Sequence, residues 1–161
     1  MTAVAYRTML EAEIDYIKDL ATRWQSYSYV SAGVGLVLAI IAASMRGYSA
    51  HGAAMISREV AYGAAAAIFG AGCLGCAVFQ VVGRRLLRDL DLARVESVVA
   101  PGRAEPSEKY IRIAAGGAWF LLRRADWDRL ALPVCVLAQV TLEFTPASRV
   151  VLTVNGSPVY A

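Results

Sequence analysis

Two cysteines have the spacing of a thiol redox pair, but their surroundings favour a structural role. Cys73 and Cys76 form a Cys-x-x-Cys motif inside a long apolar stretch. Redox pairs of this kind act at accessible helix starts, where the helix dipole lowers the pKa of the thiol. In an apolar segment, cysteine is a small, soft packing residue. We therefore interpret both cysteines as packing residues.

Other residues that could do chemistry are also few. Asp126 and Asp128 could form an acid/base pair, but Arg124 and Arg129 are close in sequence and favour solvated ion pairs. The one histidine, His51, lies in a short polar connection. Residues 84–161 contain no phosphate-binding Gly-Lys pattern and no plausible set of metal ligands. We expect no enzymatic activity, no cofactor, no metal and no small-molecule substrate.

Two uncharged stretches dominate the chain. They run from Trp24 to Met45 and from Val60 to Gly83. As helices they would reach about 33 and 36 Å, against a hydrocarbon core of about 30 Å. The apolar content of 58% supports the same conclusion. The sequence predicts a transmembrane hairpin.

Basic residues next to these stretches predict the orientation. They flank the outer ends of the hairpin more densely than its connection, which indicates that both termini are cytoplasmic and that the protein lies in the inner membrane. Arg84, Arg85 and Arg88 follow the second stretch directly and are expected to contact lipid headgroups. The predicted order is a cytoplasmic amphipathic helix (1–23), a first transmembrane helix (24–45), an extracytoplasmic loop (46–59), a second transmembrane helix (60–83) and a cytoplasmic β domain (84–161).

The N-terminal segment carries an apolar stripe with helical spacing. Its polar face has mixed charge, whereas helices that lie on lipid are usually rich in Lys and Arg. A protein partner is one interpretation, and packing on this chain's own C-terminal domain or continuation of the first span is the other. The stripe consists of Leu10, Ile14, Ile17, Ala21 and Trp24.

Both apolar stretches contain small residues at every fourth position. Such residues let helix backbones approach closely in lipid. The two ladders could face each other within the hairpin, or they could contact other membrane subunits. They are Ser31, Gly35, Ala39 and Ala43 in the first stretch, and Gly63, Ala67, Ala71 and Gly75 in the second.

After the second stretch the periodicity changes from helical to extended. Strands are predicted over 95–99, 110–113, 118–122, 134–144 and 150–154, with turns at Pro101-Gly102, Gly116-Gly117 and Asn155-Gly156. A short helical turn over 124–130 would place Trp127 and Leu130 against the sheet. The predicted class is an α+β membrane protein whose β domain is a small sheet or partly closed barrel of about five strands.

Four segments of this domain carry a resemblance. They are Arg88-Asp89-Leu90, the strand 94–98, the hairpin 110–113 with Gly117 and Phe120, and the segment 144–152. In this order they resemble uncharacterised bacterial proteins with two membrane spans and a small cytoplasmic β domain. The resemblance implies an architecture and no activity.

Two function classes are compatible with these features. The first is a non-catalytic accessory subunit of a larger integral membrane complex, with other membrane subunits and lipids as partners. The second is an independent membrane-tethered binding module whose β domain recognises a peptide or a lipid headgroup. Residues 84–161 carry 11 basic and 8 acidic side chains, an excess too small to predict nucleic-acid binding.

Overall fold

The chain folds into two compact units. The computed structural model describes residues 5–44, 58–131 and 136–160. One unit contains the described residues up to Asp19 together with those from Arg85 onward, and the other contains Leu20–Arg84. Residues 5–19, which precede the first apolar stretch, therefore fold with the C-terminal domain.

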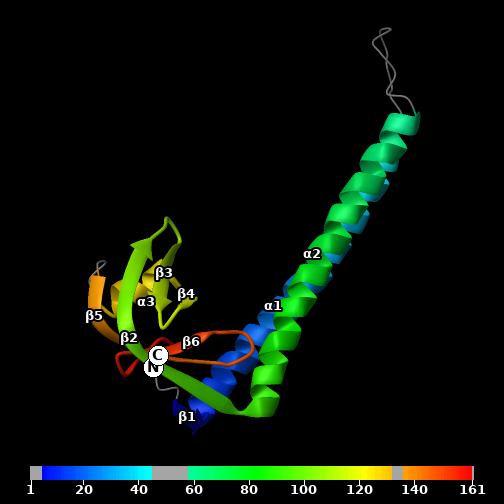
Figure 1. Ribbon diagram of the computed structural model, residues 1–161. Coiled ribbons are helices and arrows are strands. Elements are labelled where there is room, and N and C mark those ends of the chain that lie inside the picture. The colour runs from blue at the N-terminus through cyan, green and yellow to red at the C-terminus, as the bar shows by residue number, and fades with distance from the viewer. Residues whose placement is uncertain (1–4, 45–57, 132–135, 161) are drawn as a thin grey trace. The chain divides into compact units, whose positions relative to one another are not determined.

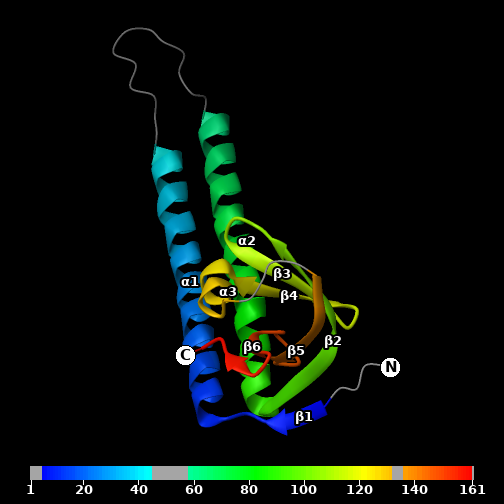
Figure 2. The same cartoon turned by 90° about the vertical axis from the view of Figure 1, so that its left-hand side faces the viewer.

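Two helices account for the second unit and extend into the first. Helix α1 spans Glu11–Ser44 and α2 spans Arg58–Leu92, and between residues 20 and 84 they run side by side (Figure 2). The most apolar 18-residue windows have mean hydropathies of 1.7 and 2.0, and only 11% and 6% of their positions are buried. A core helix of a soluble protein would bury most of that surface. Both helices are long and apolar enough to cross a membrane.

The first unit is built on a seven-stranded antiparallel sheet (Figure 1). Its order is β4-β3-β2-β5-β6-β7, and β1 pairs with the beginning of β2. Strand β2 is the longest and pairs with β1, β3 and β5. The strands are β1 (Ala5–Thr8), β2 (Arg94–Pro106), β3 (Tyr110–Ala115), β4 (Ala118–Arg123), β5 (Val136–Phe144), β6 (Val151–Val154) and β7 (Ser157–Pro158).

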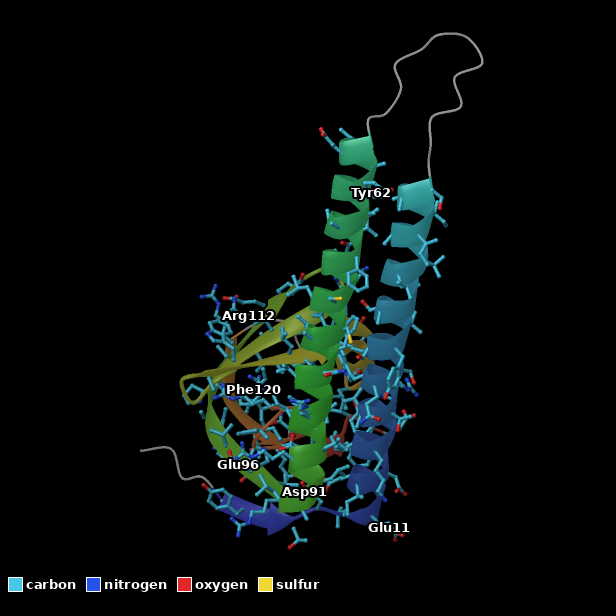
Figure 3. All side chains as sticks on the ribbon, turned by 90° about the vertical axis from the view of Figure 1, so that its right-hand side faces the viewer. Glu11, Tyr62, Asp91, Glu96, Arg112 and Phe120 are labelled. Carbon is cyan, nitrogen blue, oxygen red and sulfur yellow. The ribbon has the colours of Figure 1, made fainter. Side chains whose placement is uncertain are left out.

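Alternation of apolar and polar residues gives the sheet one buried face. In β3 and β4, Ile111, Ile113, Phe120 and Leu122 are buried while the residues between them are largely exposed. Figure 3 shows Phe120 within the domain and Arg112 at its periphery. The core also includes Val98, Ala100, Ala104, Ala115, Trp127, Val140, Leu142, Phe144, Val151, Val154 and Val159.

Helix α3 (Arg124–Arg129) has the arrangement predicted for the helical turn. Trp127 is only 1% exposed and Leu130 packs against the core. Asp126 lies 3.1 Å from Arg129, and Asp128 lies 3.9 Å from Arg124. The two aspartates are thus engaged in exposed ion pairs rather than with each other.

Two predicted hairpin turns are confirmed. Gly116 and Gly117 have φ values of 59° and 82°, and Asn155 and Gly156 have values of 52° and 80°. Two consecutive positive φ angles match the right-handed twist of the flanking strands. These residue pairs connect β3 to β4 and β6 to β7.

Three other expectations are corrected. The N-terminal helix begins only at Glu11, and residues 5–8 form β1 instead. Of the two predicted forms of the β domain, the open sheet is found and the partly closed barrel is not, and the sheet has seven strands instead of about five. Pro101-Gly102 does not end a strand but lies within β2, where the register with β5 shifts between Ala100 and Gly102. A Cβ atom at Gly102 would lie 2.5 Å from Val140 Cγ1, so the close packing there requires glycine.

Candidate functional site

The two long helices meet along a seam of small residues. A Cβ atom at Gly35 would lie 2.8 Å from Gly72 Cα, and one at Gly72 would lie 2.9 Å from Gly35 Cα. The helix backbones are therefore in van der Waals contact at this point. Ser31 Oγ donates to the carbonyl oxygen of Gly72 at 3.2 Å, which adds a hydrogen bond across the same contact.

Larger side chains extend the seam toward residue 20. Ser28 is buried, and its Oγ lies 3.1 Å from Cys76 Sγ. The ring of Phe79 packs on Trp24 and Tyr27 at centroid distances of 5.5 and 6.2 Å. Cys76 therefore has the packing role expected of it, whereas Cys73 is exposed, and both are free thiols. His51 lies outside the described residues.

The two small-residue ladders do not face each other along their whole length. On α1, Gly35 and Ala39 are buried and Ser31 and Ala43 are half-buried; on α2, Gly75 is half-buried, but Gly63, Ala67 and Ala71 are exposed. Helix geometry explains the difference, because each step of four residues turns by 400° and moves a ladder about 40° around the helix. The α2 seam instead combines steps of three and four residues, through Ala65, Ile68, Gly72, Cys76, Phe79 and Gly83.

The N-terminal stripe is largely covered by this chain. Ile17 and Ala21 are buried, with exposures of 0% and 3%. Ile14 is half-buried, and Trp24 is half-buried against Phe79. Only Leu10, at 57%, remains exposed. The stripe consequently offers little surface to a separate protein.

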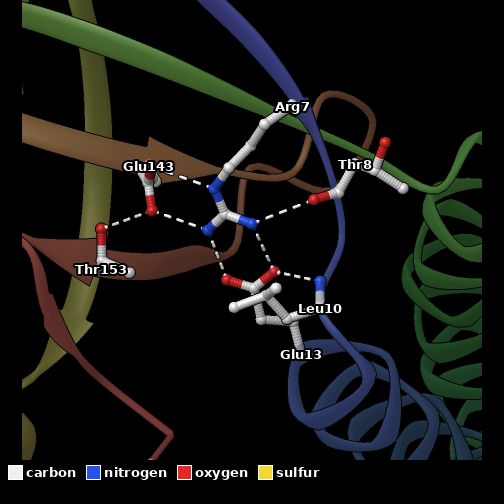
Figure 4. Close-up of polar contacts among 6 residues, drawn as sticks. All are labelled: Arg7, Thr8, Leu10, Glu13, Glu143 and Thr153. Atoms are coloured by element: carbon white, nitrogen blue, oxygen red, sulfur yellow. Dashed lines mark hydrogen bonds and ion pairs between the residues drawn. The ribbon is translucent and has the colours of Figure 1, made fainter.

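A charged cluster joins the N-terminal segment to the sheet (Figure 4). The guanidinium of Arg7 on β1 donates to Glu13 at 2.5 and 2.8 Å and to Glu143 at 2.7 and 3.1 Å. Glu13 is fully buried in the first turn of α1 and also accepts the backbone N–H of Leu10 at 2.8 Å. Glu143 on β5 accepts a further hydrogen bond from Thr153 on β6 at 2.9 Å. One arginine thus connects β1, α1, β5 and, through Glu143, β6.

These contacts change the acidity of the groups involved. The hydrogen bonds from Arg7 lower the pKa of Glu143, and Thr153 acts in the same direction. The bonds to Glu13 and Glu143 raise the pKa of Arg7. Burial, and then the charge of Glu13, raises the pKa of Tyr160, whose ring packs against Tyr16 at 5.9 Å. Arg7 and Glu143 therefore keep their charges at neutral pH, and the cluster acts as a structural joint.

Another acidic residue, Asp89, fixes a loop to the end of α2. Asp89 is fully buried and accepts the backbone N–H groups of Ala147 and Ser148 at 2.7 and 2.8 Å, and also the hydroxyl of Ser148. Thr145 Oγ1 contacts Ser148 Oγ at 2.8 Å and accepts the N–H of Val150 at 3.0 Å. The loop between β5 and β6 is therefore held by the side chains of Asp89 and Thr145.

This loop and the end of α2 line an open basic pocket, which we name the arginine pocket. The cavity has a volume of about 460 Å³ and is lined by Arg85, Arg88, Pro146, Ala147, Ser148 and Arg149. All three arginines are exposed. Within the described part of the chain, none of them forms an ion pair. The pocket can therefore offer three guanidinium groups to an anion.

Sequence reasoning found part of this arrangement. Arg85 and Arg88 were expected at a headgroup-contacting surface together with Arg84, which is exposed but does not line the cavity. Arg149 was missed, because it lies 61 residues after Arg88 and its loop is held at α2 by the contacts with Asp89. The described residues hold no group of three or more His, Cys, Asp or Glu suited to a metal ion.

The seam predicts a sharp difference between two nearby glycines. Gly72→Ala should destabilise the protein by about 1–3 kcal/mol, because the added methyl meets backbone atoms that cannot move aside. Gly70→Ala has nothing within 4 Å of its new Cβ atom, so it should be neutral or slightly stabilising, as alanine favours helix. Thermal unfolding in detergent micelles measures both. Equal effects of the two substitutions on thermal stability would contradict the close helix contact at Gly72.

The Arg7 cluster predicts a specific dependence on acid. Because the folded-state pKa of Glu143 is below its ordinary value of 4.5, its stabilising contribution is present above that value and is lost as the pH falls through the lowered pKa. Glu143→Gln should reduce stability at neutral pH by about 1.5–3 kcal/mol and flatten the acid dependence.

Glu105→Gln is the matched control, since its ion pair with Arg103 is exposed and should contribute less than about 1 kcal/mol. Unfolding curves recorded across the acid range compare the two variants. If both variants keep the acid dependence of the unmodified protein, the cluster does not stabilise the fold.

Comparisons with known proteins indicate no function, so the function is inferred from the structural features described above. No protein-family model, no curated protein and no solved structure gives a significant match to the chain. The resemblance to two-span bacterial proteins is therefore still an expectation. The features available for a functional argument are the helix seam, the Arg7 cluster and the arginine pocket.

Proposed function

We propose that this chain is a non-catalytic binding module, anchored by its hairpin in the inner membrane with both termini in the cytoplasm. The single observation that carries the proposal is that both ends of the hairpin enter one folded domain. The first turn of α1 is joined to the sheet by Arg7, and the last turns of α2 are joined to it by Asp89. Such a unit needs no other chain to complete its fold.

The contacts of the acidic and apolar side chains support a non-catalytic binding module. Glu13, Glu143 and Asp89 accept hydrogen bonds that hold elements together, which suits structure rather than acid/base chemistry. Ile17 and Ala21, once candidates for a partner surface, are covered within the chain. The arginine pocket is open to a ligand and is lined by three arginines that form no ion pair within the described residues.

A second candidate function is that of an accessory subunit in a larger membrane complex. It is favoured by the exposed ladder of Gly63, Ala67 and Ala71 on α2. A small-residue face of this kind would allow close approach by a helix of another membrane protein. The space beside Gly63 is open, with nothing within 4 Å of its potential Cβ atom.

Native mass measurement after gentle detergent extraction tests the proposal. We expect a monomer or a loose dimer, because the fold is completed within one chain. Ala67→Leu and Leu74→Ala should both leave this mass unchanged, since both positions are exposed and would face lipid. The contrary result is a stable partner in fixed stoichiometry that is lost in Ala67→Leu but kept in Leu74→Ala. It would overturn the proposed binding module and support the accessory-subunit function.

A further inference from the structure

We propose that the arginine pocket binds the phosphate group of an anionic phospholipid headgroup, one lipid for each chain. This inference rests on the proposed membrane anchoring. A basic segment beside a membrane span would contact headgroups without a defined site. The arginine pocket, in contrast, is a defined cavity with a ligand chemistry of its own, and it includes Arg149 from a distant loop.

The position of the pocket along α2 suits a headgroup. Gly83 is the last residue of the uncharged stretch, and Arg85 and Arg88 follow two and five residues later in the same continuous helix. At 1.5 Å per residue they lie about 3 and 7.5 Å beyond Gly83 along the helix axis. The polar layer on each side of a bilayer has about this depth.

The charges of the pocket suit a phosphate. An arginine guanidinium can bind phosphate oxygens through two parallel hydrogen bonds, and three such groups line the cavity. Asp89, which contacts two residues of the pocket lining, is buried, and its two carboxylate oxygens accept bonds from Ala147 and Ser148. The three arginines and Asp89 together carry a net positive charge.

The loop is built to hold its arginine in place. Arg149 has a φ of 58°, a left-handed conformation that non-glycine residues seldom adopt. Its N–H donates to the carbonyl oxygen of Thr145 at 3.0 Å, and Asp89 fixes the two preceding residues. Because Asp89 occupies the N–H groups of Ala147 and Ser148, recognition falls to the guanidinium groups. A cavity of about 460 Å³ is in the size range of small-molecule sites.

The test uses the full-length protein in vesicles of phosphatidylcholine, with and without phosphatidic acid. Lipid retained after extraction is counted by native mass spectrometry, and affinity is obtained by titrating phosphatidic acid. We expect one retained phosphatidic acid for each chain. Arg88→Gln and Arg149→Asn should each weaken binding about fivefold, and their combination with Arg85→Gln about 100-fold. Asparagine at 149 tolerates the left-handed backbone, so the loop is preserved.

Arg84→Gln is the matched control, because Arg84 is exposed and adjacent to Arg85 but does not line the cavity. If Arg84→Gln weakens lipid binding as much as the pocket variants do, binding depends on diffuse surface charge and the proposed site is wrong. Inorganic phosphate is titrated in the phosphatidylcholine sample. Binding of inorganic phosphate that requires Arg88 and Arg149, without retention of phosphatidic acid, would overturn the lipid source. The chain mass in the same spectra tests the proposed module separately.

Discussion

The arrangement of the first unit depends on the hydrogen bonds that the guanidinium of Arg7 makes with Glu13 and Glu143. The guanidinium binds two carboxylates at once, and one of them, Glu13, is fully buried. A buried carboxylate without its cation destabilises a protein by several kcal/mol, so β1 and the start of α1 are strongly coupled. Asp89 couples the end of α2 to the β5–β6 loop by hydrogen bonds. The hairpin is consequently continuous with the β domain at both of its ends.

This coupling determines where ligand chemistry can occur. The buried acids are engaged in holding elements together, whereas the arginines at the end of α2 are exposed and form no ion pair within the described residues. Asp89 is central to both roles, because the bonds that secure the loop also bring Arg149 to Arg85 and Arg88. The same contact thus stabilises the fold and assembles the pocket.

Local signals in the sequence predicted the long helices, the two glycine-containing hairpin turns and the helical turn around Trp127, because each depends on composition or spacing within a few residues. Nonlocal features were not predicted. Strand β1 is only four residues long and is defined by pairing with β2, almost 90 residues later. Glu143 follows the alternation of an ordinary strand, so nothing nearby indicates that its partner is Arg7. Most of the ladder on α2 turns away from α1, because a strict four-residue repeat drifts around the helix.

Amide hydrogen exchange of β1 tests most directly the claim that Arg7 joins the N-terminal segment to the sheet. In the unmodified protein, amides of residues 5–8 that pair with β2 should be protected. Arg7→Met should remove that protection while the β3–β4 hairpin stays protected, because opening would be confined to the joint. Arg103→Met, which removes an exposed ion pair, should leave β1 unchanged. Free exchange of β1 in the unmodified protein, or equal protection in Arg7→Met, would contradict the account.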